Sequence, residues 1–400
     1  MLKLENKTIL ITGIAGFIGS HLAKCLLRTA KGTRIIGIDN LNSYYDVRLK
    51  ENRLNELYAL SADAEFVFVH GSIADGDTVS DVFRRYRPQI VVNLAAQAGV
   101  RHSITHPAEY MEANVTGFFH ILEACRSRDP DGIGAVEHLI FASSSSVYGN
   151  TCRIPYSVDE KTDEPVSFYA ATKKADELMA YAYSSLYGIP MTGLRFFTVY
   201  GPAGRPDMAY FRFAEQMRGG EPIRLFNYGE CRRDFTFVDD IVSGIVRVMQ
   251  KAPEENRGGA RYKLYNIGNG HPVRVLDFVD ILQQELIRAD VLPRDYRAGD
   301  HIEMLPMQPG DVEETCADVS GLLRDFGFRP QTPLREGLRR FALWYKDYCA
   351  DRENGNGRIR DSGYGSSTEA GNRSDRGSGD DANAGKRSNQ DTGYSGEGHG

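Results

Sequence analysis

The chain has 400 residues, 41% of them hydrophobic and 26% charged, which suits one large or two interlocked globular domains. Its net charge of −6 argues against a nucleic-acid-binding surface, and no stretch approaches the ~20 apolar residues that a membrane span needs. Six scattered cysteines without a CxxC pair, and an N-terminus without a signal-peptide layout, predict a cytoplasmic protein that has neither a disulfide framework nor a zinc site.

The first two hundred residues alternate short apolar runs with segments of helical spacing. TILIT, RIIGID, EFVFV, QIVVNLA, VEHLIFAS and MTGLRFF read as strands, and FIGSHLAKCLLRTA is one of the helical segments between them. This alternation predicts an α/β fold, with a Rossmann-type doubly wound parallel sheet.

The first strand leads into ITGIAGFIGSHLA, in which Gly13, Gly16 and Gly19 follow the pattern G-x-x-G-x-x-G. Glycines let the backbone approach a pyrophosphate, and the helix that opens here offers free N–H groups and a positive dipole end. Three glycines alone are weak evidence for a nucleotide, and a purely structural turn is the alternative.

The second strand, RIIGID, ends in Asp39, twenty residues after Gly19. A carboxylate here can accept hydrogen bonds from both hydroxyls of an adenosine ribose, and it would repel a 2′-phosphate. Asn40 follows it where an arginine would accommodate that phosphate. The glycine turn and Asp39 together predict NAD, rather than NADP, as the cofactor.

A later strand ends in four serines, in FASSSSVYGN, and the next helical segment contains YAATKK. Tyr169 and Lys173 are four residues apart, so they lie on one face of a helix. A phenol with a pKa of ~10 is a poor base at neutral pH. A neighbouring ammonium group and a cationic nicotinamide would both stabilise the phenolate and lower that pKa.

The second half of the chain is less regular. Residues 201–350 contain Pro- and Gly-rich turns, and we expect them to form mainly a substrate-binding cap on an NAD-binding domain of residues 1–200. A segment at about 235–270 is expected to return to that domain. Residues 351–400 consist mostly of Gly, Ser, Asn, Asp and Arg, which predicts a disordered tail.

Seven stretches resemble the extended short-chain dehydrogenase/reductases that act on nucleotide sugars, and most closely the UDP-glucuronate 4-epimerases. They are GIDNLNSYYDVRLK, NLAAQAGVRHS, ASSSSVYG, YAATKKADELMA, LRFFTVYGPAGRPDMA, RRDFTFVDDI and LPMQPGDVEETCADVS. The resemblance covers about residues 5 to 348 and implies a catalytic triad of Ser144, Tyr169 and Lys173. Ala203 departs from the family pattern, which often has an aromatic residue there.

The resemblance also implies the remaining contacts with the cofactor and with a UDP-sugar substrate. Arg233 and Arg274 would contact the diphosphate, because guanidinium pairs with phosphate in bidentate fashion. Gln308 and Asp311 would hold the uridine ribose. Further NAD contacts would come from the glycine turn and from the ends of later strands: Phe17, Ile18, Ser72, Ile73, Leu94, Ala95, Ala96, Gln97, Asn114 and Phe196.

The serine row bears on the reaction. Dehydratases of this kind place an Asp–Glu pair where this chain has Ser145 and Ser146, and hydroxyls cannot do that acid–base work at neutral pH. Ser144, Ser145, Ser146 and Thr198 could instead donate to the carboxylate of glucuronate, with Arg205 nearby. The resemblance implies C4 oxidation by NAD, rotation of the 4-keto sugar and re-reduction, and the serine row fits a substrate carboxylate, so we expect interconversion of UDP-glucuronate and UDP-galacturonate.

Two other functions fit the same motifs. A 4-epimerase of a neutral sugar, UDP-glucose or UDP-N-acetylglucosamine, would have no use for a carboxylate cradle. A non-catalytic NAD-binding regulator that recruits a partner through its tail would not need a phenolate base. A homodimer is expected, because YMEANVTGFFHIL and KKADELMAYAYSSLYG could form a helix bundle between subunits.

One pair of histidines has the spacing of metal ligands. His102 and His106 have the i, i+4 spacing of a metal pair on a helix. Pro107 follows them, so we expect the pair to lie in a loop, and the sequence shows no carboxylate or Cys cluster to complete a site. The sequence therefore predicts no metal.

Overall fold

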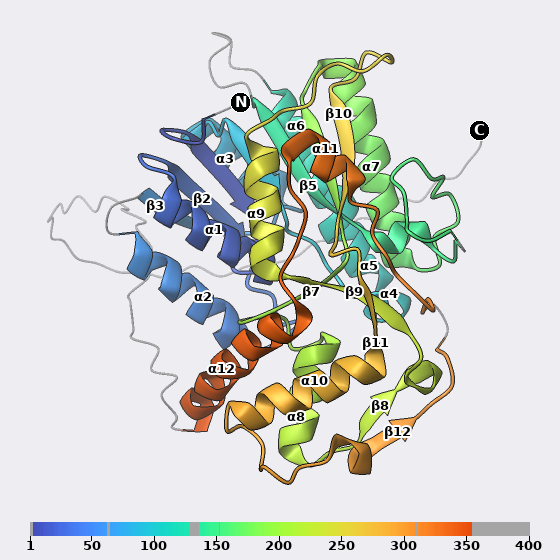
Figure 1. The fold of residues 1–400 in the computed structure, drawn as a ribbon. Coiled ribbons are helices and arrows are strands. Elements are labelled where there is room, and N and C mark those ends of the chain that lie inside the picture. Colours follow the sequence, from blue (N-terminus) through green and yellow to red (C-terminus); the bar gives the residue numbers. More distant parts are fainter. Residues whose placement is uncertain (1–2, 62–64, 128–135, 152, 309–310, 354–400) are drawn as a thin grey trace, which may run out of the picture. The chain divides into compact units, whose positions relative to one another are not determined.

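A computed structural model of the chain describes residues 3–61, 65–127, 136–151, 153–308 and 311–353, all within one compact unit (Figure 1). Its centre is a seven-stranded sheet of order β10-β6-β5-β4-β1-β2-β3, in which every neighbouring pair is parallel. The strands are β1 (Thr8–Thr12), β2 (Arg34–Asp39), β3 (Glu65–His70), β4 (Ile90–Asn93), β5 (His138–Ser144), β6 (Met191–Phe196) and β10 (Tyr262–Ile267). The expected Rossmann-type sheet is confirmed, and β10 lies within the segment 235–270.

Alternate side chains of the strands pack on opposite faces of the sheet. Ile9 and Ile11 of β1 belong to the hydrophobic core on one face, and Leu10 belongs to the core on the other. Helices α1 (Phe17–Thr29), α2 (Val47–Leu60) and α9 (Val238–Met249) contribute to the first core; α3 (Gly76–Tyr86), α6 (Gly117–Arg126) and α7 (Phe168–Tyr187) contribute to the second. Both faces are covered, so the central strands β2, β1, β4, β5 and β6 are mostly buried, whereas the edge strand β3 is partly exposed.

Smaller elements surround this sheet. A three-stranded sheet contains β7 (Thr198–Tyr200), β9 (Arg232–Phe237) and β11 (Pro272–Arg274), and a two-stranded sheet contains β8 (Ile223–Leu225) and β12 (Ile302–Met304). Figure 1 shows β8 and β12 beside α8 (Ala209–Gly219) and α10 (Val275–Arg288), away from the central sheet. The other elements are α4 (His102–Thr105), α5 (Pro107–Tyr110), η1 (Met111–Thr116), η2 (Ser145–Tyr148), η3 (Phe226–Gly229), η4 (Ala298–His301), α11 (Ser320–Phe326) and α12 (Leu334–Glu353).

The last helix reaches beyond the expected end of the folded part. α12 continues to Glu353, so residues 351–353, which composition assigned to the tail, are helical. The rest of the predicted tail lies outside the described residues. Within the described ranges, no helix combines the length and the apolar character that crossing a membrane requires.

Candidate active site

A cavity of about 950 Å³ opens at the carboxyl ends of the central strands. The loops that follow β1, β2, β4, β5 and β6 line it, together with residues of α8, β8 and β9. In an open parallel sheet, ligands bind at this edge, beside the point where the strand order reverses. Here that point lies between β1 and β4.

The glycine turn after β1 forms part of the wall. Gly13 has a φ of +67°, and a Cβ on it would lie 2.8 Å from the amide nitrogen of Ala95. A Cβ on Gly19 would overlap the carbonyl oxygen of Gly13. Gly16 caps α1, and Phe17 and Ile18 of its first turn also line the cavity. The helix N-terminus is therefore open to an anionic group.

Asp39 stands beside this turn at the end of β2. Its Oδ2 accepts a hydrogen bond from the Ala15 amide at 3.0 Å, and its Oδ1 accepts one from the Leu41 amide at 2.9 Å. The backbone thus fixes the carboxylate on the wall, with Asn40 next to it. The glycine cradle and this oriented carboxylate fit a dinucleotide.

The loop after β4 continues the wall and is tied to β1. Thr12 Oγ1 donates to Asn93 Oδ1 at 2.6 Å and accepts from the Ala95 amide at 3.0 Å. The remaining apolar and small residues expected to contact NAD all line the same cavity: Ser72, Ile73, Leu94, Ala95, Ala96, Gln97 and Phe196.

The first turns of α7 carry the two reactive side chains expected from sequence. Ser167 caps this helix by accepting from the Ala170 amide, and both Tyr169 and Lys173 line the cavity. Lys173 is buried, and its Nζ donates to Asp176 Oδ2 at 3.0 Å. Burial raises the pKa of Asp176 to about 6, even though the Lys173 charge acts in the opposite direction.

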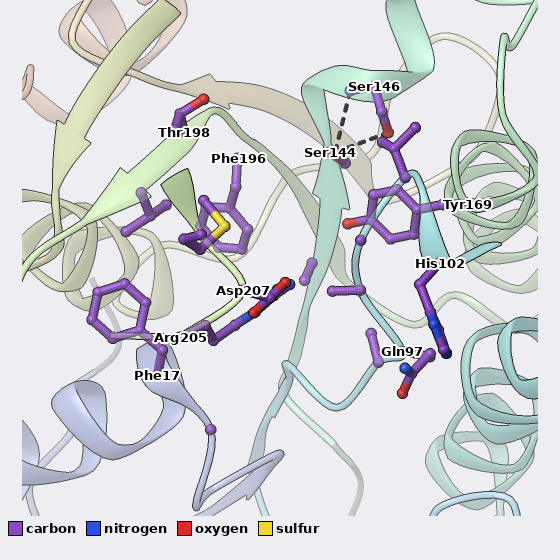
Figure 2. A pocket seen from close by; sticks show the side chains of 18 of the residues that line it. Phe17, Gln97, His102, Ser144, Ser146, Tyr169, Phe196, Thr198, Arg205 and Asp207 are labelled. Atoms are coloured by element: carbon purple, nitrogen blue, oxygen red, sulfur yellow. Dashed lines mark hydrogen bonds and ion pairs between the residues drawn. The ribbon is translucent and has the colours of Figure 1, made fainter. Parts of the chain in front are cut away.

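The serine row forms the wall nearest to Tyr169. Ser144 ends β5, and Ser145 and Ser146 open η2; all three are half-buried and line the cavity. Ser146 Oγ lies 2.9 Å from Ser144 Oγ. In Figure 2 the Tyr169 hydroxyl points into the space beside these serines, and Thr198 and Arg205 lie across it. A phenol and several hydroxyls therefore converge on one volume.

A buried ion pair holds α7 against the strands that carry the serines. Glu177 accepts from Arg195 Nε at 2.7 Å and from Arg195 Nη2 at 2.8 Å, and it also accepts from Ser143 Oγ at 2.6 Å. The Arg195 guanidinium stacks 4.8 Å from the ring of Tyr148. All of these groups are buried, so one ionic network joins α7, β5 and β6.

Arg205 is on the wall, but it already has a partner. Its Nε and Nη2 donate to the two oxygens of Asp207, at 3.0 and 2.6 Å, and Tyr44 donates to Asp207 at 3.3 Å. Burial disfavours charge on Asp207, but Arg205 outweighs it and holds the pKa of Asp207 below its usual value. Sequence reasoning missed Asp207, although it stands two residues from Arg205.

A second cationic group lines the cavity farther from the serines. Arg233 Nη2 donates to Asp311 at 2.5 Å, so two residues expected to bind the nucleotide contact each other. Arg101 and Arg212 also line the cavity, and Arg101 is close enough to both Arg212 and Arg233 for their charges to act on it, so the three form one positive region around Arg101. Burial, followed by the charges of Arg212 and Arg233, lowers the pKa of Arg101 despite the opposing effect of Asp311.

Three expected contact residues are not on the wall. Asn114 is buried in η1, where Gln97 and Thr172 engage its amide group, so it holds the loop after β4 to α7. Arg274 pairs with Asp277 and Glu230. Gln308 lies outside the cavity lining, next to residues that the structure does not describe. Asn114 and Arg274 therefore contact other protein groups, and Gln308 does not line the cavity.

The unusual residue Ala203 also lies off the wall. It is buried and has a φ of +49°, and its carbonyl accepts from the Arg53 guanidinium at 2.8 and 3.1 Å. The departure from the family pattern therefore changes a buried turn and not the lining of the cavity.

Comparison with known proteins assigns the chain to a family. The model for the NAD dependent epimerase/dehydratase family matches residues 9–268. The chain belongs to this family. It is 45% identical to Protein CapI of Staphylococcus aureus, covering 85% of this chain and 98% of that protein. It is 41% identical to UDP-glucuronate 4-epimerase 2 of Arabidopsis thaliana, covering 85% of this chain and 76% of that protein.

Two solved structures of the family are similar. UDP-glucuronic acid 4-epimerase of Bacillus cereus, in complex with UDP-glucuronic acid and NAD, matches with a TM-score of 0.73 and 30% identity, over 85% of this chain and 99% of that chain. UDP-glucose 4-epimerase of Thermotoga maritima matches with a TM-score of 0.71 and 28% identity, over 86% and 99%. The expected family, fold, NAD dependence and isomerase class are confirmed.

Proposed function

We propose that this enzyme interconverts UDP-glucuronate and UDP-galacturonate by inverting C4 of the sugar. One observation carries the proposal. Ser144, Ser145 and Ser146 line the cavity beside Tyr169, where an eliminating enzyme would need a carboxylic acid and its conjugate base. Hydroxyl donors suit a substrate carboxylate, and charge-assisted hydrogen bonds of this kind are about twice as strong as neutral ones.

Proton transfer belongs to Tyr169 in this proposal. As phenolate it accepts the proton of the sugar 4-hydroxyl, and it returns the proton when the other face of C4 is reduced. Ser144 holds the same oxygen, and Lys173 holds the nicotinamide ribose. When bound there, NAD would supply oxidation and re-reduction at C4, so it would be regenerated in each cycle and would not need to leave.

The sugar carboxylate is held mainly by hydroxyls. Asp207 engages two nitrogens of Arg205 and offsets its charge, which leaves chiefly Nη1 for a substrate. Arg205 therefore orients the sugar carboxylate more than it attracts it. Ser144, Ser145, Ser146 and Thr198 supply most of the hydrogen-bond donors. The 4-keto intermediate is a β-keto acid, which loses CO₂ when its C5–C6 bond stands perpendicular to the C4 carbonyl. The same hydrogen bonds keep the carboxylate, and with it this bond, away from that orientation.

The diphosphate lies in the cationic region of Arg101, Arg212 and Arg233. Three guanidinium groups with Asp311 as a nearby carboxylate can take up two phosphates without leaving a large uncompensated charge. Residues 1–200 with 235–270 then serve as the cofactor half of the enzyme, and residues 201–350 mainly as the nucleotide-sugar half.

We also propose a homodimer joined through α6 and α7. Large apolar side chains are exposed on these helices and on η1: Met111, Phe119, Leu178, Tyr181 and Leu186. An apolar surface of this kind on two adjacent helices suits a second copy of the same face, related by a two-fold axis.

Substrate preference tests the proposed reaction. We expect a higher kcat/KM for UDP-glucuronate than for UDP-glucose, and Ser145→Ala should reduce that preference by about 10- to 100-fold, the scale of one hydrogen bond to a charged group. The matched control is Ser320→Ala, which removes an exposed hydroxyl outside the cavity and should change neither value. A wild-type preference for UDP-glucose would show that the cavity is built for a neutral sugar.

A further inference from the structure

The loop that follows β4 brings together three side chains that can bind a metal. His102, His106 and Glu109 each offer one ligand atom, and these atoms all lie within 4.8 Å of one another. His102 Nε2 lies 3.0 Å from Glu109 Oε2. The two histidines alone do not predict a metal site, but the fold brings the Glu109 carboxylate beside them.

Their spacing explains the convergence. His102, His106 and Glu109 are at positions i, i+4 and i+7, which share one face of a helix. Pro107 interrupts the helix between α4 and α5, but the His106 amide still donates to the His102 carbonyl at 3.0 Å. His106 itself has non-helical backbone angles (φ −129°, ψ 54°), but this hydrogen bond still brings its ring against that of His102. The two imidazole rings stack with their centroids 4.1 Å apart and their planes at 11°.

One nitrogen of the His106 ring already has a hydrogen-bonding neighbour. His106 Nδ1 lies 2.8 Å from Thr105 Oγ1, and among the described residues no hydrogen bond engages its Nε2. Metal-bound histidines usually direct one ring nitrogen at the ion and the other at a hydrogen-bonding group that fixes the ring. Thr105 can serve as that group for His106.

The ligand set indicates the class of ion. Two imidazoles and one carboxylate, with a position left open for water, are typical of Zn²⁺ and neighbouring divalent transition ions, and not of Mg²⁺ or Ca²⁺. Tetrahedral zinc with bonds of about 2.0–2.1 Å needs ligand atoms about 3.4 Å apart. The His106 and Glu109 side chains are exposed, so they can turn to close this difference. Binding would replace the stack of His106 on His102 and the hydrogen bond between His102 and Glu109, because the in-plane lone pairs of stacked imidazoles do not meet at one ion.

We infer that His102, His106 and Glu109 bind a divalent transition-metal ion of the Zn²⁺ class at the rim of the active-site cavity. His102 lines that cavity, and its ring lies 5.0 Å from that of Tyr44, which donates to Asp207. This site is separate from the hydride chemistry and does not depend on which sugar the enzyme uses.

Equilibrium dialysis of the full-length, tag-free enzyme against ZnCl₂, with metal analysis, tests the inference. We expect one Zn²⁺ per chain, and an affinity reduced at least about tenfold in both His106→Ala and Glu109→Gln, since removal of even an outer-shell partner has effects of that size. Zn²⁺ should also raise the unfolding temperature of the wild-type enzyme more than that of His106→Ala.

The matched control is His271→Ala, which removes an exposed imidazole outside the cluster and should leave zinc binding unchanged. Circular dichroism without metal checks that each variant is folded. Because His106→Ala and Glu109→Gln change different side chains, a folding defect in one variant still leaves the other as a test. Equal zinc binding by wild type, His106→Ala and Glu109→Gln, or no stoichiometric binding by the wild type, would overturn the inference.

Discussion

At the scale of single residues, the reactive groups depend on neighbours that do not touch the substrate. Lys173 is buried and is held by Asp176, whose Oδ1 is buried without a hydrogen-bond partner in the described part of the chain. Asp176 therefore orients the Lys173 ammonium group. One oxygen of the buried Asp176 carboxylate is left without a hydrogen bond, which is unfavourable for its charged form. This carboxylate gives the folded chain a pH dependence of its own.

We predict that Asp176→Asn changes the pH dependence of stability. The Asp176 carboxyl has a pKa of about 6 in the folded chain and ~3.9 when unfolded, so its stabilising protonated form is lost as the pH rises through 6. Relative to wild type, the variant should gain about 2 kcal/mol of unfolding free energy between pH 4.5 and 7.5. Urea unfolding at both pH values measures this difference.

The control for this comparison is Asp159→Asn, which alters an exposed carboxyl and should show no such gain. A difference between Asp176→Asn and wild type that stays constant, or that falls as the pH rises, would contradict the role assigned to the buried carboxyl.

A second prediction at this scale concerns the 4-keto intermediate. Ser145→Ala removes one donor from the carboxylate cradle, so the C5–C6 bond can rotate toward the geometry that releases CO₂. We expect a UDP-pentose by-product from UDP-glucuronate that the wild type does not accumulate, detected by chromatography of the reaction mixture. A variant that turns over more slowly but forms no more UDP-pentose than the wild type would mean that Ser145 does not restrain this bond.

At the scale of elements, one ion pair sets the position of the helix that carries Tyr169. Arg195 and Glu177 are 2% and 3% exposed and join β6 to α7, so neither charge has water as a substitute partner. Breaking a buried pair by removing one partner costs about 3–5 kcal/mol, whereas exposed pairs contribute about 0–1 kcal/mol.

Arg195→Met should therefore destabilise the enzyme by about 3–5 kcal/mol, and the double variant Glu177→Gln/Arg195→Met should lose less than the sum of the two single changes. Arg339→Met breaks the exposed pair with Glu336 and should cost under about 1 kcal/mol. Chemical unfolding of the wild type and of these four variants gives these values. Additive single effects would mean that the two side chains act independently.

The size of each structural unit decides which features could be predicted from the sequence. The parallel sheet, the glycine turn and Asp39 follow from local patterns, because each depends on residues within one strand–turn–helix unit. The pairing of Arg233 with Asp311 and the grouping of Arg101 with Arg212 join segments far apart in the chain, so no local pattern contains them. The partners of Arg274 likewise follow from the fold: it pairs with Asp277 and Glu230 and does not line the cavity, and its contact with the diphosphate stays a prediction.

At the scale of the whole molecule, the proposed dimer rests on the apolar face of α6 and α7. Leu178 is 60% exposed near the middle of α7, and an aspartate there would bury a charge in the interface. Leu178→Asp should therefore shift the enzyme toward monomers in analytical ultracentrifugation. Leu323→Asp, at a 49% exposed leucine of α11, should leave the mass unchanged. A wild-type enzyme that sediments as a monomer would contradict the proposed dimer.

The proposed enzyme is a 4-epimerase that acts on a sugar acid and keeps its NAD. The most direct test is proton NMR of the purified enzyme mixed with UDP-glucuronate and no added NAD. We expect UDP-galacturonate to appear and then to stop at a fixed ratio, because retained cofactor is regenerated in each cycle. A reaction that gives mainly CO₂ and a UDP-pentose, or that starts only when UDP-glucose replaces the acid, would contradict the proposed function.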